Sequence, residues 1–333
     1  MTDPHPYSRL TPDLILNALE SLGLRCDGRL LALNSYENRV YQVGIEEAQP
    51  VVAKFYRPAR WSDAQVLEEH AFAAELASAE IPVVAPIAFA SRTLHEFEGF
   101  RFAVYPRRGG RAPELDDPVV LEWLGRFIGR IHAVGATKAF VHRPALDIAS
   151  FGEEPREFLV ASGLVPAELR AAWEQASALA LEGVRHAFAR AGDVARIRTH
   201  GDCHASNVLW TPPSGNDVGG PHFVDLDDSR MAPAVQDFWM LVSGDRRSMG
   251  GQLGKLLRGY EDFMEFDDRE LHLVEALRTL RLLHYSAWLA RRWDDPAFPL
   301  AFPWFNTQRY WQDRVLELKE QVAALHEPPL VPE

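Results

Sequence analysis

The stretch HGDCHASNVLW, residues 200–210, gathers histidine, aspartate, cysteine, serine and asparagine just ahead of an apolar strand-like run. A Gly/Pro-rich loop follows, and then HFVDL, residues 222–226, which has the β-branched and aromatic residues of a second strand. These segments predict a β-hairpin. Because the start of its first strand lies beside the end of its second, Asn207 and Asp225 should meet at one end, with Asp202 on the preceding loop.

These side chains suit phosphoryl transfer to a hydroxyl group. Asp202 can orient the acceptor hydroxyl and accept its proton, whereas Asn207 and Asp225 offer hard oxygen ligands for Mg²⁺. The metal ion would offset the negative charge of the phosphates of ATP. The interval between Asp202 and Asn207 equals that of the protein-kinase catalytic loop, H-R-D-x-x-x-x-N, which a metal-binding aspartate follows later in the chain.

The first eight of these residues, HGDCHASN (200–207), are compatible in part with other sites. His200, Cys203 and His204 have a spacing that can bind zinc, but zinc sites draw further ligands, and the only other cysteine is Cys26. A hydrolytic Ser206 or Cys203 would need an elbow or a partnered base, and G-x-S-x-G is absent from the sequence. A polar loop without catalytic meaning is the remaining alternative, and the adjoining hairpin argues against it.

Composition bounds the class of protein. The 333 residues are 47% hydrophobic, which suffices for two packed lobes, and a formal net charge of −12 disfavours nucleic acid as a ligand. Cys26 and Cys203 exclude a disulfide scaffold and suit a reducing cytoplasm. The N-terminal MTDPHPYSRL lacks the apolar core of a signal peptide, and no run approaches the roughly 18 apolar residues that span a bilayer, so no membrane partner is expected.

The order of predicted elements indicates an α+β protein with a bilobal, protein-kinase-like fold. Residues 1–104 predict a small β-rich N-terminal lobe that binds ATP, residues 105–110 a hinge, and residues 111–333 a larger helical C-terminal lobe that holds the catalytic hairpin. We expect a cleft between the lobes.

Individual elements follow from periodicity and capping. Thr11 and Pro12 open a helix that stops at Gly23, and Ser62 caps another. The remaining predictions are strands within 30–44, 51–56 and 101–106, and helices over 119–134, 166–191, 249–264 and 268–293.

Lys54 and Glu69 are candidate partners in ATP binding. Lys54 stands alone within the apolar strand VVAKFY, and Glu69 shares the apolar face of the following helix. A carboxylate there is costly unless it is paired, which makes Lys54 the natural partner and Glu69 a better candidate than Glu68. The pair would hold the lysine against the α- and β-phosphates. An unpaired lysine at the edge of the sheet is the plain alternative.

No glycine-rich loop precedes Lys54; the chain reads NSYENRVYQV at residues 34–43. Ser35, Glu37 and Asn38 suit a tight polar turn, whose N–H groups and Ser35 hydroxyl can contact phosphate. A hairpin turn with no ligand explains this stretch equally well.

Together these motifs resemble the aminoglycoside phosphotransferase/choline kinase-like family, and more closely a bacterial serine/threonine protein kinase within it. The resemblance covers almost the whole chain. Ordinary protein kinases differ, since this sequence has no glycine-rich loop, no D-F-G and no A-P-E segment. The matching segments are NSYENRVYQV, VVAKFYRPARW, VLEEH, HGDCHASNVLW, FVDLDDSRMAPAVQDFWML and RRWDDPAFPLAFPWF.

The resemblance implies an ATP- and Mg²⁺-dependent kinase, cytoplasmic and monomeric, that phosphorylates serine or threonine of a protein in the bacterial stress response. Asp202 then matches the proton acceptor, and Asn207 and Asp225 match magnesium ligands, with Asp225 also counted as an active-site residue. Ser35, Lys54 and Glu69 match ATP-contacting positions, and residues 104–106 would face adenine. Asp237 matches a carboxylate that braces the catalytic loop.

Two alternative functions stay open. A small-molecule kinase acting on choline, homoserine or an aminoglycoside would share these motifs, and the acidic chain could attract such cations. A pseudokinase would bind nucleotide as an interaction module, although it would more often lack one of the motif residues that are present here.

Several other features have plain structural explanations. The arginines at 278, 281, 291 and 292 are expected on a solvated helix face with ion pairs rather than in an acidic-substrate site. FPLAFPWF, residues 298–305, is expected to pack over the core rather than form a lid. His132 is expected to be a hydrogen-bonded core histidine, and Cys203 is not expected to be a redox switch.

Overall fold

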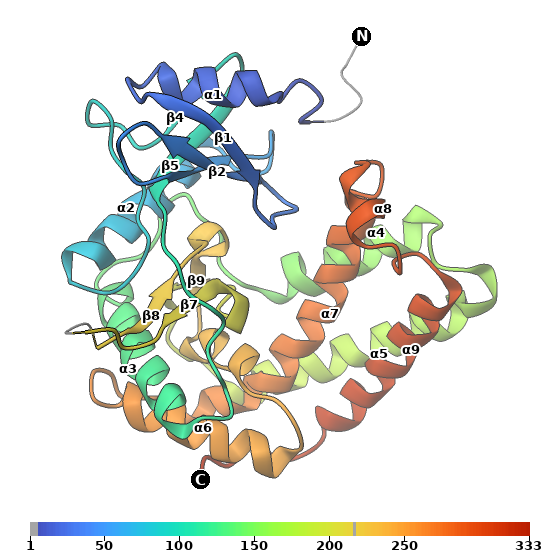
Figure 1. The fold of residues 1–333 in the computed structure, drawn as a ribbon. Helices are drawn as coiled ribbons and strands as arrows, with labels where there is room; N and C mark the ends of the chain where they lie inside the picture. Colours follow the sequence, from blue (N-terminus) through green and yellow to red (C-terminus); the bar gives the residue numbers. More distant parts are fainter. Residues whose placement is uncertain (1–5, 216–217) are drawn as a thin grey trace. The chain divides into compact units, whose positions relative to one another are not determined.

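The computed structural model describes residues 6–215 and 218–333, and it is an α+β protein as predicted (Figure 1). Residues 1–5 lie outside this range. They belong to the N-terminal segment MTDPHPYSRL, for which no signal peptide was predicted. Contacts divide the chain into two units. The first unit contains Met1–Pro113, Phe140–Arg143 and Ser206–Asp228, and the second contains Glu114–Ala139, Pro144–Ala205 and Ser229–Glu333.

The first unit is built on an antiparallel sheet whose described strands follow the order β1-β2-β3-β5-β4. Lys54 in the middle of β3 pairs with Val40 on β2 and with Ala103 on β5. The segments predicted as strands are thus confirmed. Their bounds are β1 Cys26–Ala32, β2 Arg39–Ile45, β3 Val51–Phe55, β4 His95–Phe97 and β5 Phe100–Pro106.

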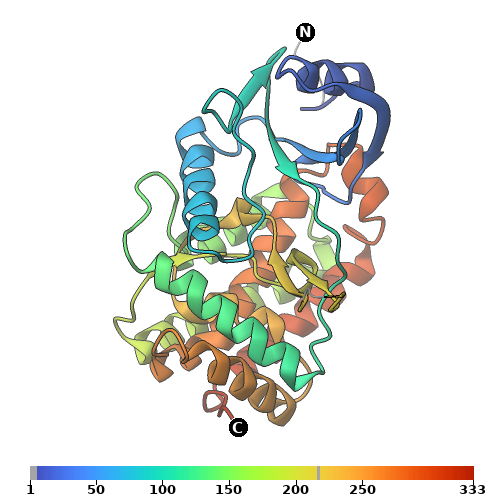
Figure 2. The same ribbon diagram turned by 60° about the vertical axis from the view of Figure 1, so that its left-hand side comes forward.

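The alternation of side chains along β3 separates a structural face from a functional one. Ala53 and Phe55 join the apolar cluster beneath α1 (Pro12–Glu20), whose N-terminus Thr11 caps. Lys54 points to the opposite face, the one that packs on α2 (Asp63–Ser78). Figures 1 and 2 show α1 and α2 on different sides of these strands. A capping box between Ser62 and Gln65 fixes the start of α2.

The predicted hairpin is confirmed as β7 (Val208–Thr211) and β8 (Gly220–Phe223). The N–H of Val224 donates to the Asn207 carbonyl at 3.0 Å, so the start of β7 lies beside the end of β8. A bridge between Val83 and Phe223 ties the hairpin to the segment after α2. Contacts therefore group the hairpin with the first unit, whereas the sequence assigned it to the C-terminal lobe; the boundaries 1–104, 105–110 and 111–333 stay a prediction.

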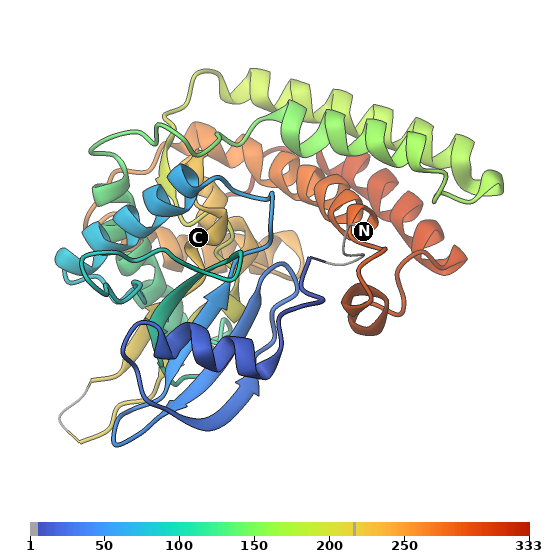
Figure 3. The same cartoon turned by 90° about the horizontal axis from the view of Figure 1, so that it is seen from above.

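The second unit is mostly helical, and small residues allow its helices to approach closely. A Cβ on Gly125 of α3 would lie 1.9 Å from the Leu256 carbonyl of α6, so glycine is required there. Helix α5 packs on α9 and α7, as Figure 3 shows. The helices are α3 Pro118–Gly135, α4 Glu154–Ser162, α5 Ala167–Ala191, α6 Arg246–Tyr260, α7 Val274–Arg291, α8 Ala297–Ala301 and α9 Gln308–Ala324.

Shorter elements connect these helices. Strands β6 (Ile197–Thr199) and β9 (Arg230–Ala232) pair next to the catalytic loop. The short helical segments are η1 Ala149–Glu153, η2 Ala205–Asn207, η3 Leu226–Asp228, η4 Ala234–Asp237, η5 Trp239–Leu241 and η6 Asp268–Leu273. Residues 298–305 contain α8, and Phe298, Phe302 and Phe305 are buried, so this segment packs on the core as expected. Among the residues that the structure describes, no helix has the length and apolar character to cross a membrane.

Candidate active site

A cavity of about 300 Å³ lies within the first unit, on the face of the sheet to which Lys54 points. Its polar lining includes every site residue that the sequence predicted in this unit: Ser35, Lys54, Glu69, Asn207 and Asp225. Its apolar walls come from the sheet, the segment after α2 and the hairpin, through Val40, Val52, Val84, Tyr105, Pro106 and Leu209. A flat apolar group and a polar, charged group can therefore be bound together here.

Lys54 is the buried cation of this cavity. Its side chain is 8% exposed, and Nζ lies 2.7 Å from Asp225 Oδ1 and 3.3 Å from Asp227 Oδ1. Burial disfavours the ammonium, but the carboxylates of Asp225 and Asp227 outweigh this and raise the pKa of Lys54 well above its ordinary value. Lys54 thus stays charged and can bind anionic groups.

The predicted ion pair between Lys54 and Glu69 is wrong. Glu69, rather than Glu68, does face the cavity and is 2% exposed, but its Oε2 has no hydrogen-bond partner among the described residues. Burial raises the pKa of Glu69 to about 7, with Lys54 acting in the opposite sense. Burial thus favours the neutral form of Glu69, which attracts the lysine less than the two aspartates do. Glu68 instead accepts the backbone N–H groups of residues 141–143.

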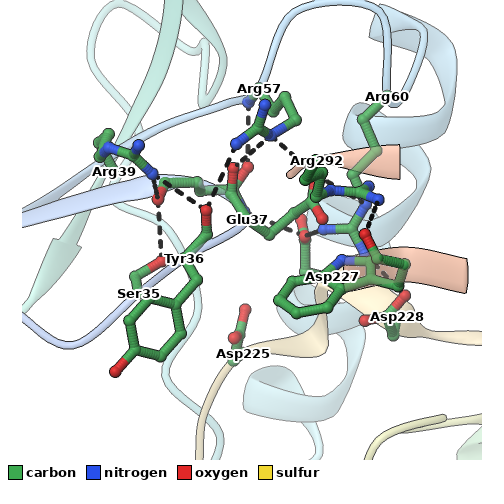
Figure 4. Close-up of polar contacts among 12 residues, drawn as sticks. Ser35, Tyr36, Glu37, Arg39, Arg57, Arg60, Asp225, Asp227, Asp228 and Arg292 are labelled. Carbon is green, nitrogen blue, oxygen red and sulfur yellow. Dashed lines mark hydrogen bonds and ion pairs between the residues drawn. The ribbon is translucent and has the colours of Figure 1, made fainter. Parts of the chain in front are cut away.

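Asp227 is the carboxylate that fixes Lys54, and sequence analysis missed it. Its Oδ2 accepts from Arg60 at 2.5 Å and from Asn38 Nδ2 at 3.0 Å (Figure 4). Arg60 also binds Asp228 at 2.8 Å. Burial would raise the pKa of Asp227, but Lys54 and Arg60 lower it below its usual range. Two sequence features could have indicated the role of Asp227: the arginines of RPAR, residues 57–60, and the acidic run VDLDD, residues 224–228.

The turn before β2 is held by arginines (Figure 4). Arg57 Nε donates to the Glu37 carbonyl at 3.0 Å and lies 3.1 Å from Glu37 Oε1. Arg39 donates to the Tyr36 carbonyl at 3.0 Å. Ser35 lines the cavity and donates its hydroxyl to the Asn38 carbonyl at 3.1 Å. The turn is therefore ordered by its own ion pairs.

Asp225 has an unusual backbone, with φ of 60°, in the left-handed region that aspartate tolerates better than most residues. Its side chain is 53% exposed, so the carboxylate can take further ligands. Asn207 lines the same cavity and adds an amide oxygen. A carboxylate and an amide fit a hard cation such as Mg²⁺, which takes its other ligands from phosphate and water.

The zinc alternative can be set against the described geometry. In residues 6–215 and 218–333, no group of three or more His, Cys, Asp or Glu side chains is placed to hold a metal ion. The predicted magnesium ligands are of another kind, since one of them is an amide.

The catalytic loop belongs to the second unit, where Asp237 braces it as the resemblance implied. The Asp237 carboxylate accepts the N–H groups of His200 at 2.7 Å and Gly201 at 2.9 Å. Its Oδ2 also lies 3.0 Å from His132 Nε2. His132 is buried and hydrogen-bonded, which confirms that prediction. Gln236 adds a hydrogen bond to the Gly201 carbonyl at 2.8 Å. The backbone just before Asp202 is thus fixed.

Asp202 itself is 21% exposed and bears an ion pair that the sequence did not predict. Its Oδ1 lies 2.5 Å from the guanidinium of Arg281 on α7, and its Oδ2 lies 3.4 Å from His204 Nε2. Arg281 thus lies on a partly exposed helix face with an ion pair, as expected, but its partner, Asp202 of the catalytic loop, was not foreseen. Cys203 is buried, and burial raises the pKa of its thiol well above the ordinary value, so it is not a reactive thiolate.

Comparison with sequence families supports the fold and the general activity. Residues 29–274 match the model of the phosphotransferase enzyme family. The chain is 45% identical over 324 residues to stress response kinase A of Escherichia coli K12, covering 97% of this chain and 96% of that protein. It is 44% identical, over the same shares of both chains, to the protein named serine/threonine protein kinase RdoA of Salmonella typhimurium LT2.

Solved structures share the fold at low sequence identity. Amicoumacin kinase hAmiN, in complex with AMP-PNP, Ca²⁺ and Ami, has a TM-score of 0.71 at 17% identity, covering 96% of this chain and 95% of that one. A microcompartment-associated aminopropanol kinase has a TM-score of 0.69 at 18% identity, covering 93% and 96%. The predicted protein-kinase-like fold is confirmed by these neighbours.

Proposed function

The chain belongs to the phosphotransferase enzyme family, and from that premise we propose that it is an ATP- and Mg²⁺-dependent serine/threonine protein kinase. The relatives at 44–45% identity carry the names of kinases, one of them a serine/threonine protein kinase, which supports this acceptor class. Their names also support a part in the bacterial stress response, and we infer that the protein acts as a monomer in the cytoplasm.

One observation carries the proposal. Ser35, Lys54, Glu69, Asn207 and Asp225 come from segments far apart in the sequence, yet all line one cavity with an apolar wall. That wall suits an adenine ring, with Tyr105 and Pro106 on the linker that the sequence predicted to face it. Val104, the first residue of the segment 104–106, is buried in the apolar cluster beneath α1 and does not line the cavity.

The charged residues divide the work of phosphoryl transfer. Lys54 binds the phosphates of ATP, and Asp227 and Arg60 keep it in place. Asn207 and Asp225 would hold Mg²⁺, which when bound supplies positive charge to the phosphates. Asp202 accepts the proton of the acceptor hydroxyl, from a loop whose backbone Asp237 holds. Most of the rate enhancement then comes from positioning and charge stabilisation.

A small-molecule kinase is the second candidate, since amicoumacin kinase and aminopropanol kinase share the fold. Those structural neighbours are below 20% identity, so they speak for the fold and not for the acceptor. The pseudokinase alternative is disfavoured because the lysine, the asparagine and the three carboxylates of the motif set are all in place.

The test is transfer of labelled phosphate from ATP, with and without Mg²⁺, to a generic serine/threonine protein, to the kinase itself and to aminoglycosides and amino alcohols. We expect metal-dependent labelling of protein and little labelling of the small molecules. Labelling of an amino alcohol alone would establish the second candidate. Nucleotide binding without transfer to any acceptor would establish the pseudokinase.

A further inference from the structure

We propose that Arg281 sets the acceptor specificity of this kinase by excluding cationic acceptors from Asp202. The inference rests on the proposed function, and it names the acceptor class: hydroxyl groups in neutral or acidic surroundings, such as serine or threonine without neighbouring lysine or arginine. It separates this protein from kinases of amino-bearing alcohols that share its fold.

The guanidinium of Arg281 is held on a rigid element. Arg281 lies near the middle of α7, between the buried Leu280 and Leu283, and α7 packs on α4 and α5. The Nη1 atom of Arg281 lies 2.5 Å from Asp202 Oδ1, and Asp202 is the ion-pair partner of Arg281 among the described residues. The Arg281 side chain is still 40% exposed, so an incoming acceptor meets its charge.

The sign of that charge decides what can approach Asp202. An isolated aspartate would attract an ammonium group and so favour an amino alcohol. With Arg281 bound to Oδ1, the charge of Asp202 is neutralised and no longer attracts a cation. A second cation that approaches the exposed guanidinium of Arg281 meets like-charge repulsion. The formal net charge of −12 attracts cations to the whole protein, so the local arginine opposes the overall field.

The aromatic residues farther along α7 do not reverse this preference. Trp288, about 10 Å beyond Arg281 along the helix, could in principle bind a quaternary ammonium by its ring face. However, the Arg292 guanidinium already lies 5.2 Å from the Trp288 ring centre, and Tyr285 stacks on the ring at 5.6 Å. Phe298 and Phe302 also contact the Trp288 ring. With these partners in place, Trp288 offers no cage for a cationic acceptor.

The experiment measures kcat and KM for serine peptides of one length whose flanking residues are aspartate, glutamine or lysine. Choline and its uncharged isostere 3,3-dimethylbutan-1-ol form a second pair. For the wild-type protein we expect kcat/KM to be about ten-fold lower for the lysine-flanked peptide than for the glutamine-flanked one. The difference should appear in the acceptor KM, because repulsion acts on binding.

Variants of α7 identify the cause. Arg281→Gln should bring the ratio of kcat/KM between glutamine- and lysine-flanked peptides close to unity. Arg281→Lys, which retains the positive charge, should keep the wild-type ratio. Arg278→Gln is the matched control, one helical turn away, because Arg278 contacts Glu275, Met249 and Trp239 instead of Asp202. It should keep the wild-type ratio. If Arg281→Gln lacks a cooperative thermal transition, Arg281→Met, which keeps much of the side-chain length, replaces it.

The outcomes separate the two hypotheses. A wild-type preference for lysine-flanked peptides or choline, or an unchanged ratio in both folded Arg281 variants without the charge, overturns the role of Arg281 while leaving the kinase intact. Loss of transfer in wild type with every acceptor overturns the proposed function and this inference with it.

Discussion

Asp225 and Asp202 each lie beside one cation, but their surroundings differ. Asp225 sits after β8 with a left-handed backbone and an exposed carboxylate, and its partner Lys54 is buried and shared with Asp227. Asp202 follows a backbone that the buried Asp237 holds by hydrogen bonds, and its partner Arg281 is a half-exposed side chain on a helix.

The difference suggests that the two regions respond to ligands in different ways. In the Asp225 region, charges are held by other charges, so an incoming phosphate can replace a carboxylate next to Lys54 without breaking a backbone hydrogen bond. In the Asp202 region, hydrogen bonds from Asp237 fix the backbone. Only the side chain of Arg281, beside Asp202, can change its position. We therefore expect substitutions in the first region to change nucleotide use, and substitutions in the second to change turnover and stability.

The largest effect is expected at Asp202. Asp202→Asn removes the proton acceptor that we propose but keeps the side-chain shape, so kcat should fall about 10³-fold. Thermal unfolding should change little, because Asp237 and not Asp202 holds the loop. Initial rates of phosphate transfer and a melting curve test both points. Near-native turnover would remove Asp202 from the mechanism.

Lys54→Met should lower kcat/KM for ATP about 10²-fold, mainly through KM, because the cavity loses its buried cation. Kinetics over a range of ATP concentrations, together with nucleotide titration, provide the measurement. Arg29→Met is a matched control, as Arg29 is an exposed β1 residue paired with Asp27 outside the cavity. Equal effects of the two substitutions would refute the phosphate-binding role.

Asp237→Asn tests whether the second region depends on its backbone. The amide can no longer accept from both His200 and Gly201 through carboxylate oxygens, and a buried donor is left unpaired. We expect unfolding by urea to require about 1–3 kcal/mol less free energy. We also expect kcat to fall while the KM for ATP stays constant. A rise in that KM would mean that the two regions are not separable in this way.

The smallest effect is expected at Glu69, and it depends on pH. The pKa of Glu69 is about 7 in the folded protein and 4.5 for an ordinary glutamate, so the unfolded chain ionises first as pH rises. The unfolding free energy should fall between these pH values and then level off. Glu69→Gln should remove a loss of about 1–2 kcal/mol between pH 6 and pH 8.

Urea titrations of both proteins at these two pH values test this expectation. The buried Glu270, whose pKa is also raised to about 7 by burial, titrates in both and cancels in the comparison. Identical pH dependence in wild type and variant would mean that Glu69 is ionised in the folded cavity and that its pairing needs revision.

Much of the fold was predictable because it depends on local signals. The hairpin, the strands around Lys54 and the capped helices follow from periodicity and from Thr11 and Ser62 as caps. Helices α4 and α9 were not predicted; α4 begins with Glu154–Pro155 after an irregular turn, and α9 has few buried residues to mark its apolar face. Their stability comes from packing on α7 and α5, which one sequence does not show.

The residue types of the site were predictable, but the pairing of its charges was not. Periodicity correctly placed Glu69 on the inner face of α2. It could not show that Asp227 lies nearer to Lys54 than Glu69 does. That contact joins residues 173 positions apart. Arg281 and Asp202 are likewise 79 positions apart, and no local pattern connects them. Charge pairing over such separations depends on the tertiary fold.

The left-handed backbone of Asp225 restricts which substitutions can occur there during evolution or in a saturation library. Glycine and asparagine fit this conformation, whereas valine, isoleucine and threonine would each add backbone strain of roughly 1–3 kcal/mol to the lost carboxylate. Library scores at this position would therefore mix protein abundance with chemistry. Asparagine is the substitution that separates them, since it changes the charge and keeps the local geometry.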